Sequence, residues 1–402
     1  MPDSGTPIGE VLAKAQAGTA LAETDAYSFL SANLEAIQEM CAVAGTMRDQ
    51  TKGKVVTFSP KVFIPLTHLC RDFCGYCTFR KDPQQAGKDL FMKPEQILDV
   101  ANVGAALGCT EALFTLGERP EQRYSEAREW LKHRGFKTTL EYLTHACQLV
   151  LEETDMLPHA NPGTMARREI DALKPFNPSM GLMLESTSDV LWAEGGPHEF
   201  APSKRPRVRL RTLELAGELR VPFTTGILIG IGESRRDRIE SLLAIADLHA
   251  QHGHVQEVII QNFRAKPQTA MGDSPDAETE EFLWTVAAAR LILGANANLQ
   301  VPPNLSAKDY HIYLDAGIND WGGVSPLTID FVNPEAPWPA LNDLKQKTEA
   351  AGFELKPRLP VYPEYFLDTK EFLPASLQQK VSALADAEGY VQGGMQRYAS
   401  KF

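Results

Sequence analysis

The sequence predicts an α/β fold: one (β/α)8 TIM-type barrel with a helical extension before it and a cap after it. The chain has 402 residues, enough for one large barrel or two ordinary domains. From residue 55 onward, short apolar and β-branched runs alternate with helical segments, which is typical of parallel strands joined by crossover helices. Eight such units in about 270 residues fit a single closed barrel. We therefore expect an extension over residues 1–54, a barrel over 55–333 and a cap over 334–402.

The N-terminal extension is predicted to be helical. Apolar residues recur at helical spacing in IGEVLAKAQAG (8–18) and YSFLSANLEAIQEMCAVAG (27–45), and Gly45 is a candidate helix stop. No basic segment followed by an apolar run begins the chain, and no stretch approaches about 18 uninterrupted apolar residues. We expect no signal peptide, no membrane span and a cytoplasmic location.

The barrel elements follow in order along the chain. The expected strands are VFIPL (62–66), EALFTL (111–116), DMLPHAN (155–161), SMGLMLE (179–185), FTTGILIG (223–230), VQEVIIQNF (255–263), NLQVPP (298–303) and DWGGVS (320–325). The expected amphipathic helices are PEQILDVANVGAALG (94–108), TTLEYLTHACQLVLEE (138–153), MARREIDALK (165–174), RVRLRTLELAGELR (207–220), RRDRIESLLAIADLHAQ (235–251) and AETEEFLWTVAAARLILG (277–294). The cap contains one further helix, ALNDLKQKTEAAG (340–352).

The long irregular segments and the net charge both indicate a small-molecule site. Residues 80–92, 194–207 and 264–276 each follow an expected strand, so they lie at the face of a barrel where ligands bind. The formal net charge is -12, from 52 acidic and 40 basic residues, which argues against a nucleic-acid surface.

Three of the six cysteines form a C-x3-C-x2-C motif in THLCRDFCGYCTFR (67–80), directly after the first expected strand. In a reducing compartment, the spacing of Cys70, Cys74 and Cys77 favours a metal site or a redox group over structural disulfides. Zinc sites usually take four protein ligands in two pairs, and no second pair is present. Three thiolates around a [4Fe-4S] cluster leave one iron open for a ligand. From spacing alone the cluster is favoured, while zinc and a redox thiol site stay open.

The motif and its surroundings resemble the radical S-adenosylmethionine (SAM) superfamily, with Tyr76 as the aromatic residue before the third cysteine. The resemblance implies that the open iron binds the amino and carboxylate groups of SAM, and that one electron splits SAM into methionine and a 5'-deoxyadenosyl radical. TLGERPE resembles the superfamily turn that holds the methionine amino group, through Gly117 and Glu118, although Leu116 replaces one glycine.

Further matches to the superfamily follow in the correct order. Glu185 in MLES resembles the residue that binds the SAM ribose hydroxyls, and a carboxylate can accept both hydrogen bonds of a diol. Arg209 resembles an arginine that pairs with the SAM carboxylate. GILIGIGE (226–233) resembles the pattern that lies against the adenine, where Gly230 allows close approach and Glu233 stabilises the turn.

Several stretches are more closely similar to the CofG subunit family of 7,8-didemethyl-8-hydroxy-5-deazariboflavin (FO) synthase. They are VFIPLTHLCRDFCGYCTFR, TLGERPE, LPHANPG, MGLMLES, QNFRAKPQTAM, VPPNL and GINDWGGVSPLTIDFVNPEAPWP. The resemblance implies a radical SAM lyase that forms FO from 5-amino-5-(4-hydroxybenzyl)-6-(D-ribitylimino)-5,6-dihydrouracil and releases ammonia. It also implies a CofH-type partner subunit that makes this adduct, and an external one-electron donor. Two alternatives remain: another radical SAM enzyme, such as a futalosine-pathway cyclase, and a non-enzymatic zinc-binding protein.

Polar residues at the ends of later strands are candidates for binding the substrate, which carries hydroxyls, a uracil ring and a phenol. They are His159, Asn161, Gln261, Asn262, Arg264, Asn304, Asn319, Asp320 and Trp321. The other cysteines, Cys41, Cys109 and Cys147, are expected to be buried small apolar residues. The fifth strand carries Thr224 and Thr225 where relatives with a second cluster would need a thiolate, so we expect one cluster.

Overall fold

A computed structural model describes residues 6–306, 309–369 and 371–398 of the chain. In these residues eight parallel strands close into a barrel in chain order, because β1 pairs with β2 on one edge and with β8 on the other. The strands are β1 (Val55–Thr67), β2 (Glu111–Leu116), β3 (Leu157–Asn161), β4 (Ser179–Gly181), β5 (Phe223–Ile229), β6 (Val255–Asn262), β7 (Leu299–Gln300) and β8 (Asp320–Val324). The predicted barrel is confirmed.

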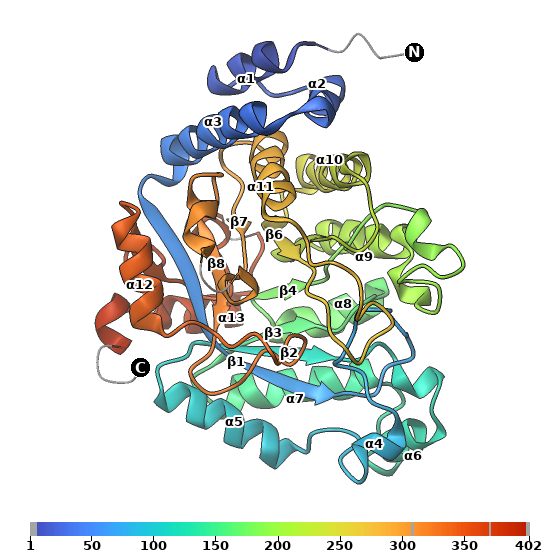
Figure 1. The fold of residues 1–402 in the computed structure, drawn as a ribbon. Helices are drawn as coiled ribbons and strands as arrows, with labels where there is room; N and C mark the ends of the chain where they lie inside the picture. Colours follow the sequence, from blue (N-terminus) through green and yellow to red (C-terminus); the bar gives the residue numbers. More distant parts are fainter. Residues whose placement is uncertain (1–5, 307–308, 370, 399–402) are drawn as a thin grey trace.

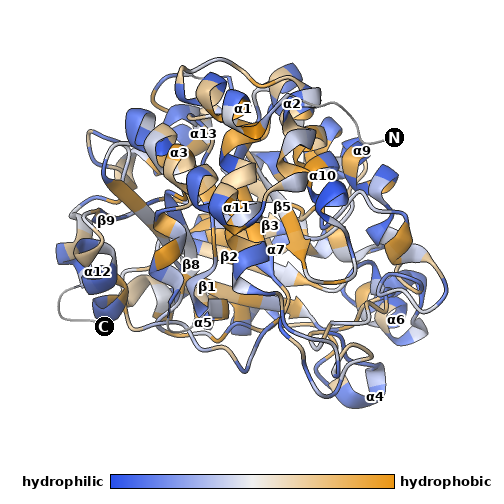
Figure 2. Ribbon diagram, turned by 45° about the horizontal axis from the view of Figure 1, so that its top comes forward, coloured by the Kyte–Doolittle hydropathy of each residue, from blue (hydrophilic) through white to orange (hydrophobic). Residues whose placement is uncertain are grey.

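Helices surround the barrel in the order expected for crossover connections (Figure 1). They are α4 (Pro83–Ala86), α5 (Pro94–Ala106), α6 (Ser125–His133), α7 (Thr139–Glu153), α8 (Arg167–Leu173), α9 (Pro206–Glu218), α10 (Arg235–His252) and α11 (Thr279–Leu293). Their apolar faces turn toward the strands, which form the hydrophobic interior in Figure 2. The regular alternation fails after β7, where the described residues form only the 3-10 segments η6 (Pro303–Ser306) and η7 (Tyr310–Leu314).

The N-terminal extension forms α1 (Ile8–Gln16), α2 (Glu23–Tyr27) and α3 (Leu34–Lys52), and α3 packs against α11 at the top of Figure 1. The predicted helix stop at Gly45 is wrong, because α3 continues through it and ends before Gly53. A Cβ atom on Gly45 would lie 2.8 Å from the carbonyl oxygen of Asp315. The glycine therefore serves close packing inside the helix rather than termination.

Several strand predictions need correction. β4 and β7 cover only Ser179–Gly181 and Leu299–Gln300 of the expected 179–185 and 298–303. The first strand begins at Val55 rather than residue 62, and the cap supplies a ninth strand, β9 (Glu354–Pro357), that was not predicted. β9 pairs in parallel with Val55–Phe58 at the start of β1. Its four residues alternate charge with apolar side chains and end in proline, so they carry little strand signal on their own. The cap also contains α12 (Leu341–Ala350), which was predicted, and α13 (Ala375–Leu384).

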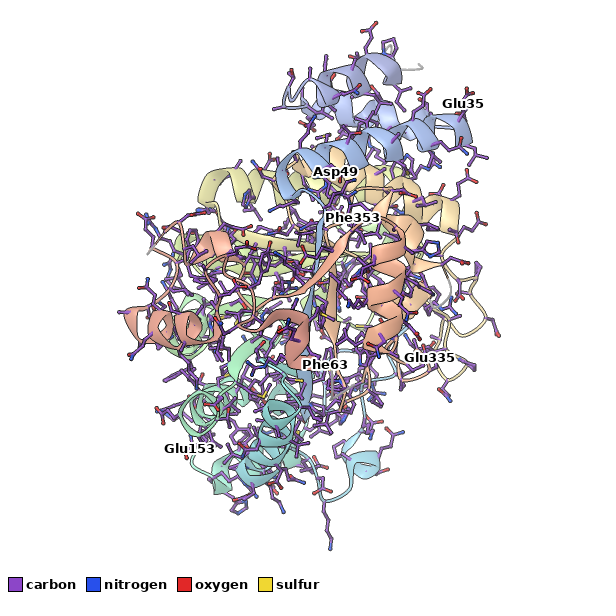
Figure 3. The ribbon with its side chains drawn as sticks, turned by 90° about the vertical axis from the view of Figure 1, so that its left-hand side faces the viewer. Glu35, Asp49, Phe63, Glu153, Glu335 and Phe353 are labelled. Carbon is purple, nitrogen blue, oxygen red and sulfur yellow. The ribbon has the colours of Figure 1, made fainter. Side chains whose placement is uncertain are left out.

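The end of α3 connects the extension to the cap. Figure 3 shows Asp49 of α3 beside Phe353, which directly precedes β9. The Arg48 guanidinium lies 4.3 Å from the centre of the Phe353 ring, and it also donates to the carbonyl oxygen of Leu314 at 3.1 Å.

Cys41, on the same helix, is only partly buried, so its predicted burial is wrong, whereas Cys109 and Cys147 are buried as expected. None of the helices in the described part of the chain is both long and apolar enough to cross a membrane.

Candidate active site

The cysteine motif lies on the loop that leaves the C-terminal end of β1, which is the ligand-binding face of a barrel. Two other segments hold this loop through three backbone hydrogen bonds. The amide of Arg71 donates to the carbonyl oxygen of Glu118 at 2.8 Å, and the amide of Gly75 donates to that of Pro197 at 2.7 Å. The amide of Phe73 donates to the carbonyl oxygen of Phe200 at 3.0 Å. The loop is therefore positioned by segments that follow β2 and β4.

Cys70, Cys74 and Cys77 are all partly buried and line the same cavity. Burial raises the pKa of the Cys70 thiol to about 12 and also raises the pKa of Cys74. The amide of Glu118 donates a hydrogen bond to Sγ of Cys70 at 3.1 Å. In iron–sulfur proteins, hydrogen bonds of this kind tune the reduction potential. The described residues contain no group of three His, Cys, Asp or Glu side chains converging on one metal position. The thiolates of a cubane cluster bind three different irons, so they need not converge in that way.

Gly117 allows the end of β2 to approach the cysteine loop. A Cβ atom at this position would lie 2.0 Å from the carbonyl oxygen of Leu69 and 2.7 Å from Cβ of Cys70. Rotating a side chain cannot relieve either contact, because the first neighbour is a backbone atom and the second is a Cβ atom, whose position the backbone fixes. The next residue, Glu118, lines the cavity and accepts hydrogen bonds from the amide and hydroxyl of Thr164 at 3.0 and 2.7 Å. Burial raises the pKa of this carboxyl group.

A second set of charged side chains in the cavity comes from the segments that follow β4. Glu185 forms an ion pair with Lys204 and lies 4.0 Å from the guanidinium of Arg209, and all three side chains line the cavity. Burial alone would raise the pKa of Glu185, but the two positive charges lower it below its ordinary value. Sequence reasoning missed Lys204, because it lies in the irregular segment 194–207 with no spacing that marks it.

Tyr76 lies in the cavity lining, whereas Glu233 in the turn after β5 lies outside it. The Tyr76 ring lines the cavity, and its hydroxyl lies 2.9 Å from Nε2 of His198. Glu233 lies outside the cavity lining, where it accepts from the amides of Gly230 and Ile231 at 2.8 and 2.9 Å. It also pairs with Arg238 at 2.8 Å, so its contacts in the structure are those of the turn.

The expected substrate residues divide into two groups. His159, Asn161, Gln261, Asn262 and Arg264 line the cavity, whereas Asn304, Asn319, Asp320 and Trp321 do not.

The second group makes structural contacts instead. Asn304 donates to Asp330 at 3.0 Å and Asn319 accepts from Arg290 at 2.9 Å. Trp321 is fully buried in the hydrophobic core, where its indole N–H donates to Thr348.

Charged and polar side chains fill the inner end of the barrel, and sequence reasoning missed them. Those lining the cavity are Lys61, Glu111, Thr224, Glu257, Gln300 and Arg358. Lys61 Nζ lies 2.8 Å from Glu111, and Arg358 bonds both Glu257 and Asp320 at 2.6 Å. The sequence did mark Lys61, because it is a charged residue inside an apolar strand, in SPKVFIP. No sequence pattern marked Arg358, because it comes from the cap and reaches the barrel only through β9.

The segment 325–338, which we call the strap, crosses from β8 over the cavity. Trp338 stacks on Phe63 of β1 with ring centres 5.2 Å apart, and the Phe63 amide donates to Thr328 at 2.9 Å. The Asp330 carboxylate accepts from the amides of Val332 and Asn333 at 2.9 and 3.0 Å.

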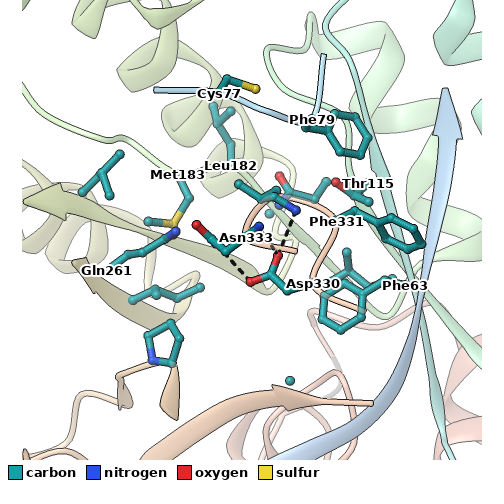
Figure 4. A pocket seen from close by; sticks show the side chains of 18 of the residues that line it. Phe63, Cys77, Phe79, Thr115, Leu182, Met183, Gln261, Asp330, Phe331 and Asn333 are labelled. Atoms are coloured by element: carbon teal, nitrogen blue, oxygen red, sulfur yellow. Dashed lines mark hydrogen bonds between the residues drawn. The ribbon is translucent and has the colours of Figure 1, made fainter. Parts of the chain in front are cut away.

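Figure 4 shows the cavity side of the strap. The side chains of Asp330, Phe331 and Asn333 lie in the middle of the view, opposite Met183 and Gln261. The side-chain amide of Asn333 donates to Asp330 at 3.0 Å, which fixes the orientation of the Asn333 side chain. The cavity has a volume of about 350 Å³, in the range that small-molecule ligands occupy. Charged groups line it both near the cysteine loop, as Glu118 and Glu185 do, and at its inner end, where Lys61 and Glu111 lie.

Comparison with known proteins agrees with this architecture. Residues 64–245 match the sequence profile of the Radical SAM superfamily. Two solved structures share the fold at low identity. The [FeFe]-hydrogenase maturase HydG from Carboxydothermus hydrogenoformans gives a TM-score of 0.69 at 19% identity, over 93% of this chain and 81% of that one. Methylornithine synthase (PylB) gives a TM-score of 0.63 at 16% identity, over 86% of this chain and 97% of that one.

Curated relatives are much closer in sequence. The 7,8-didemethyl-8-hydroxy-5-deazariboflavin synthase of Methanopyrus kandleri is 51% identical over 338 residues, which cover 84% of this chain and 100% of that protein. The FO synthase of Streptomyces avermitilis is 51% identical over 384 residues, which cover 93% of this chain and 45% of that protein. This chain thus spans about half the length of the longer relatives.

The closed barrel, the cysteine loop at its ligand-binding face and these matches define a radical SAM enzyme. Within that class, the chain belongs to the 7,8-didemethyl-8-hydroxy-5-deazariboflavin synthase family.

Proposed function

We propose that the chain forms FO from 5-amino-5-(4-hydroxybenzyl)-6-(D-ribitylimino)-5,6-dihydrouracil, with release of ammonia, as a radical SAM carbon–nitrogen lyase. One observation carries the proposal: the three cysteines and the strap line the same cavity. The cysteines account for the radical chemistry, and the strap contains the sequence that distinguishes this family. The names of the M. kandleri and S. avermitilis relatives support the same reaction.

Cys70, Cys74 and Cys77 would hold one [4Fe-4S] cluster, because their thiols are the soft ligands that such clusters require and all three face the cavity. Burial raises the pKa values of Cys70 and Cys74, and the positive charge of cluster iron would favour the thiolate forms that bind it. When bound, the cluster supplies the electron that cleaves SAM and so generates the organic oxidant of the reaction.

The residues around the loop would hold SAM. Glu118 would accept from the methionine amino group, and Arg209 would pair with the carboxylate. Glu185 would accept from the ribose hydroxyls, and Tyr76 would pack beside the cofactor. The Gly230–Glu233 turn would support the adenine side, where Leu228 lines the cavity. We add Lys204 to this set, since it forms an ion pair with Glu185 and fixes that carboxylate.

The remaining cavity would bind the adduct. His159, Asn161, Gln261, Asn262 and Arg264 offer hydrogen-bonding groups for a substrate rich in hydroxyl and amide groups. The aromatic residues of the strap and of the strands below it would exclude water from the reacting radical. The adduct would come from a CofH-type partner, and reduction would need an external one-electron donor.

The test is product identification with anaerobically reconstituted protein, the adduct, SAM and a reductant. We expect a fluorescent deazaflavin together with 5'-deoxyadenosine and methionine. Accumulation of 5'-deoxyadenosine without deazaflavin would instead indicate another radical SAM enzyme, such as a futalosine-pathway cyclase. Zinc without inorganic sulfide in anaerobically purified protein would refute the radical assignment altogether.

A further inference from the structure

The protonation of His159 is fixed by a chain of hydrogen bonds at the inner end of the cavity. The Ser179 hydroxyl donates to the carbonyl oxygen of Pro360 at 2.6 Å, and Nδ1 of His159 lies 2.7 Å from the same hydroxyl oxygen. A carbonyl oxygen can only accept and a hydroxyl has a single proton, so the Ser179 oxygen accepts from Nδ1–H. In the neutral ring, Nε2 is then an acceptor.

The surroundings keep His159 neutral and leave Nε2 open to the cavity. Burial lowers the pKa of His159 to about 4; the charge of Glu111 acts to raise it, and the charges of Lys61 and Arg358 act to lower it. A Cβ atom on Gly181 would lie 3.0 Å from Nε2, so the glycine leaves space beside this nitrogen. Among the hydrogen bonds of the described residues, His159 uses only Nδ1.

Lys61 presents the complementary group. Its ammonium has three donors, and Glu111 takes one of them at 2.8 Å, the single hydrogen bond of Nζ within the described chain. Lys61 pairs with Glu111 across β1 and β2, and Leu113, two residues further along β2, pairs with His159 of β3. Alternate residues of a strand share a face, so both side chains reach the barrel interior at neighbouring levels, where they line one cavity.

We propose that Lys61 and His159 recognise the imide edge of the substrate's dihydrouracil ring. Lys61 Nζ donates to a ring carbonyl oxygen, and His159 Nε2 accepts from the adjacent ring N3–H. Ser179 is the positioning residue that fixes the histidine tautomer. The inference rests on the proposed function, which supplies a ring with this alternation of donor and acceptor.

The first test changes the ligand and leaves the protein intact. The adduct and its N3-methyl analogue are compared as substrates of the reconstituted wild-type enzyme, with deazaflavin formation as the readout. Methylation removes the donor and leaves Nε2 unpaired, so we expect KM to rise roughly 10- to 100-fold. Equal KM values for the two compounds would overturn the proposal while leaving the proposed function standing.

Variants then assign the effect to the residues. In His159→Leu the ratio of the two KM values should fall to within about 3-fold of unity, because no acceptor remains to be lost. Ser179→Ala should reduce the ratio in part, since it frees the tautomer; a purely structural role would change both KM values equally. The control is His145→Leu on the outer face of α7, which should keep the wild-type ratio.

Lys61 needs a paired substitution, because its removal alone would leave Glu111 buried without its ion-pair partner. In Lys61→Met/Glu111→Gln, KM for the parent adduct should rise about 10-fold while the discrimination against N3-methylation persists. An unchanged KM would remove Lys61 from the proposal. If the wild-type enzyme cleaves SAM but forms no deazaflavin from the adduct, the proposed function fails and this inference fails with it.

Discussion

Gly117 sets the distance between the cysteine loop and β2. Because a Cβ atom would lie 2.0 Å from the Leu69 carbonyl oxygen, Gly117→Ala must displace the loop that carries Cys70. We expect iron and sulfide content to fall and SAM cleavage to decrease at least about 10-fold, with a stability loss of about 1–3 kcal/mol. The control is Gly9→Ala, where a Cβ atom would meet open space. Full cluster content in the Gly117 variant would contradict this steric argument.

Cys74 should be indispensable as a cluster ligand. We expect Cys74→Ala to abolish 5'-deoxyadenosine formation, because two thiolates cannot hold the cluster in its reactive geometry. The control is Cys41→Ala on α3, a partly buried thiol whose pKa burial raises to about 12 and which lies outside the cavity lining. SAM cleavage at the wild-type rate by the Cys74 variant would refute the ligand assignment.

At the scale of elements, the strap joins β8 to the cavity and to β1. Trp338 both stacks on Phe63 and donates from its indole nitrogen to the Thr328 carbonyl oxygen at 3.1 Å. The same segment supports η6, because Asn304 donates to Asp330. A residue expected to bind substrate thus holds the strap that does line the cavity.

We expect Trp338→Ala to loosen the strap and admit water to the reacting centre. KM for the adduct should rise about 5- to 10-fold, and more 5'-deoxyadenosine should form for each deazaflavin produced, which liquid chromatography measures. Leu327→Ala changes an exposed strap residue outside the cavity lining and should keep the wild-type product ratio. A Trp338 variant with an unchanged ratio would show that the strap does not protect the reaction.

At the scale of the whole molecule, buried charges make the stability of the barrel dependent on pH. Burial alone would raise the pKa of Glu111, but Lys61 and other nearby positive charges lower it to about 2. The stability from this carboxylate is therefore present above pH 4.5, its ordinary pKa, and is lost as pH falls toward 2.

We expect the free energy of unfolding in urea to fall between pH 4.5 and pH 3 by an amount on the order of 2 kcal/mol attributable to Glu111. The paired variant Lys61→Met/Glu111→Gln should lose that part of the pH dependence. The same slope in wild type and variant would show that other groups govern acid stability.

Glu257 should give the opposite slope at higher pH. Burial raises the pKa of Glu257 to about 7, even though the neighbouring Arg358 acts to lower it. Because its folded pKa exceeds the ordinary value near 4.5, the protonated form contributes stability at low pH that is lost as pH rises through 7. Urea unfolding of Glu257→Gln should show a smaller decline between pH 5 and pH 8 than wild type does; an equal decline would contradict this assignment.

Local patterns predicted most of the barrel. The strands and helices follow from hydrophobic periodicity, which depends on near neighbours in the chain. The helix stop at Gly45 was mispredicted and β9 was missed. Both depend on contacts with residues distant in sequence: Asp315 for Gly45, and the start of β1 for β9.

In the site, too, local patterns identified some residues, and others depend on contacts between distant parts of the chain. The cysteines, Glu118, Glu185 and Arg209 were predicted as cofactor residues from sequence patterns, and the structure brings them to one cavity. Lys204 carried no local signal. Asp320 is one layer behind the cavity, where it bonds Arg358 of the lining, and Trp321 is buried in the hydrophobic core because successive residues of a strand face opposite sides.

The sequence by itself determined the fold class, the cysteine loop and the family, because periodicity and contiguous motifs are properties of neighbouring residues. Only the tertiary structure decided how the inner end of the cavity is built. There β1, β2, β3 and the cap bring together Lys61, Glu111, His159 and Arg358, and Ser179 fixes the histidine tautomer through Pro360. These residues lie up to about 300 positions apart, and closure of the barrel is what places their charges and hydrogen bonds in one cavity.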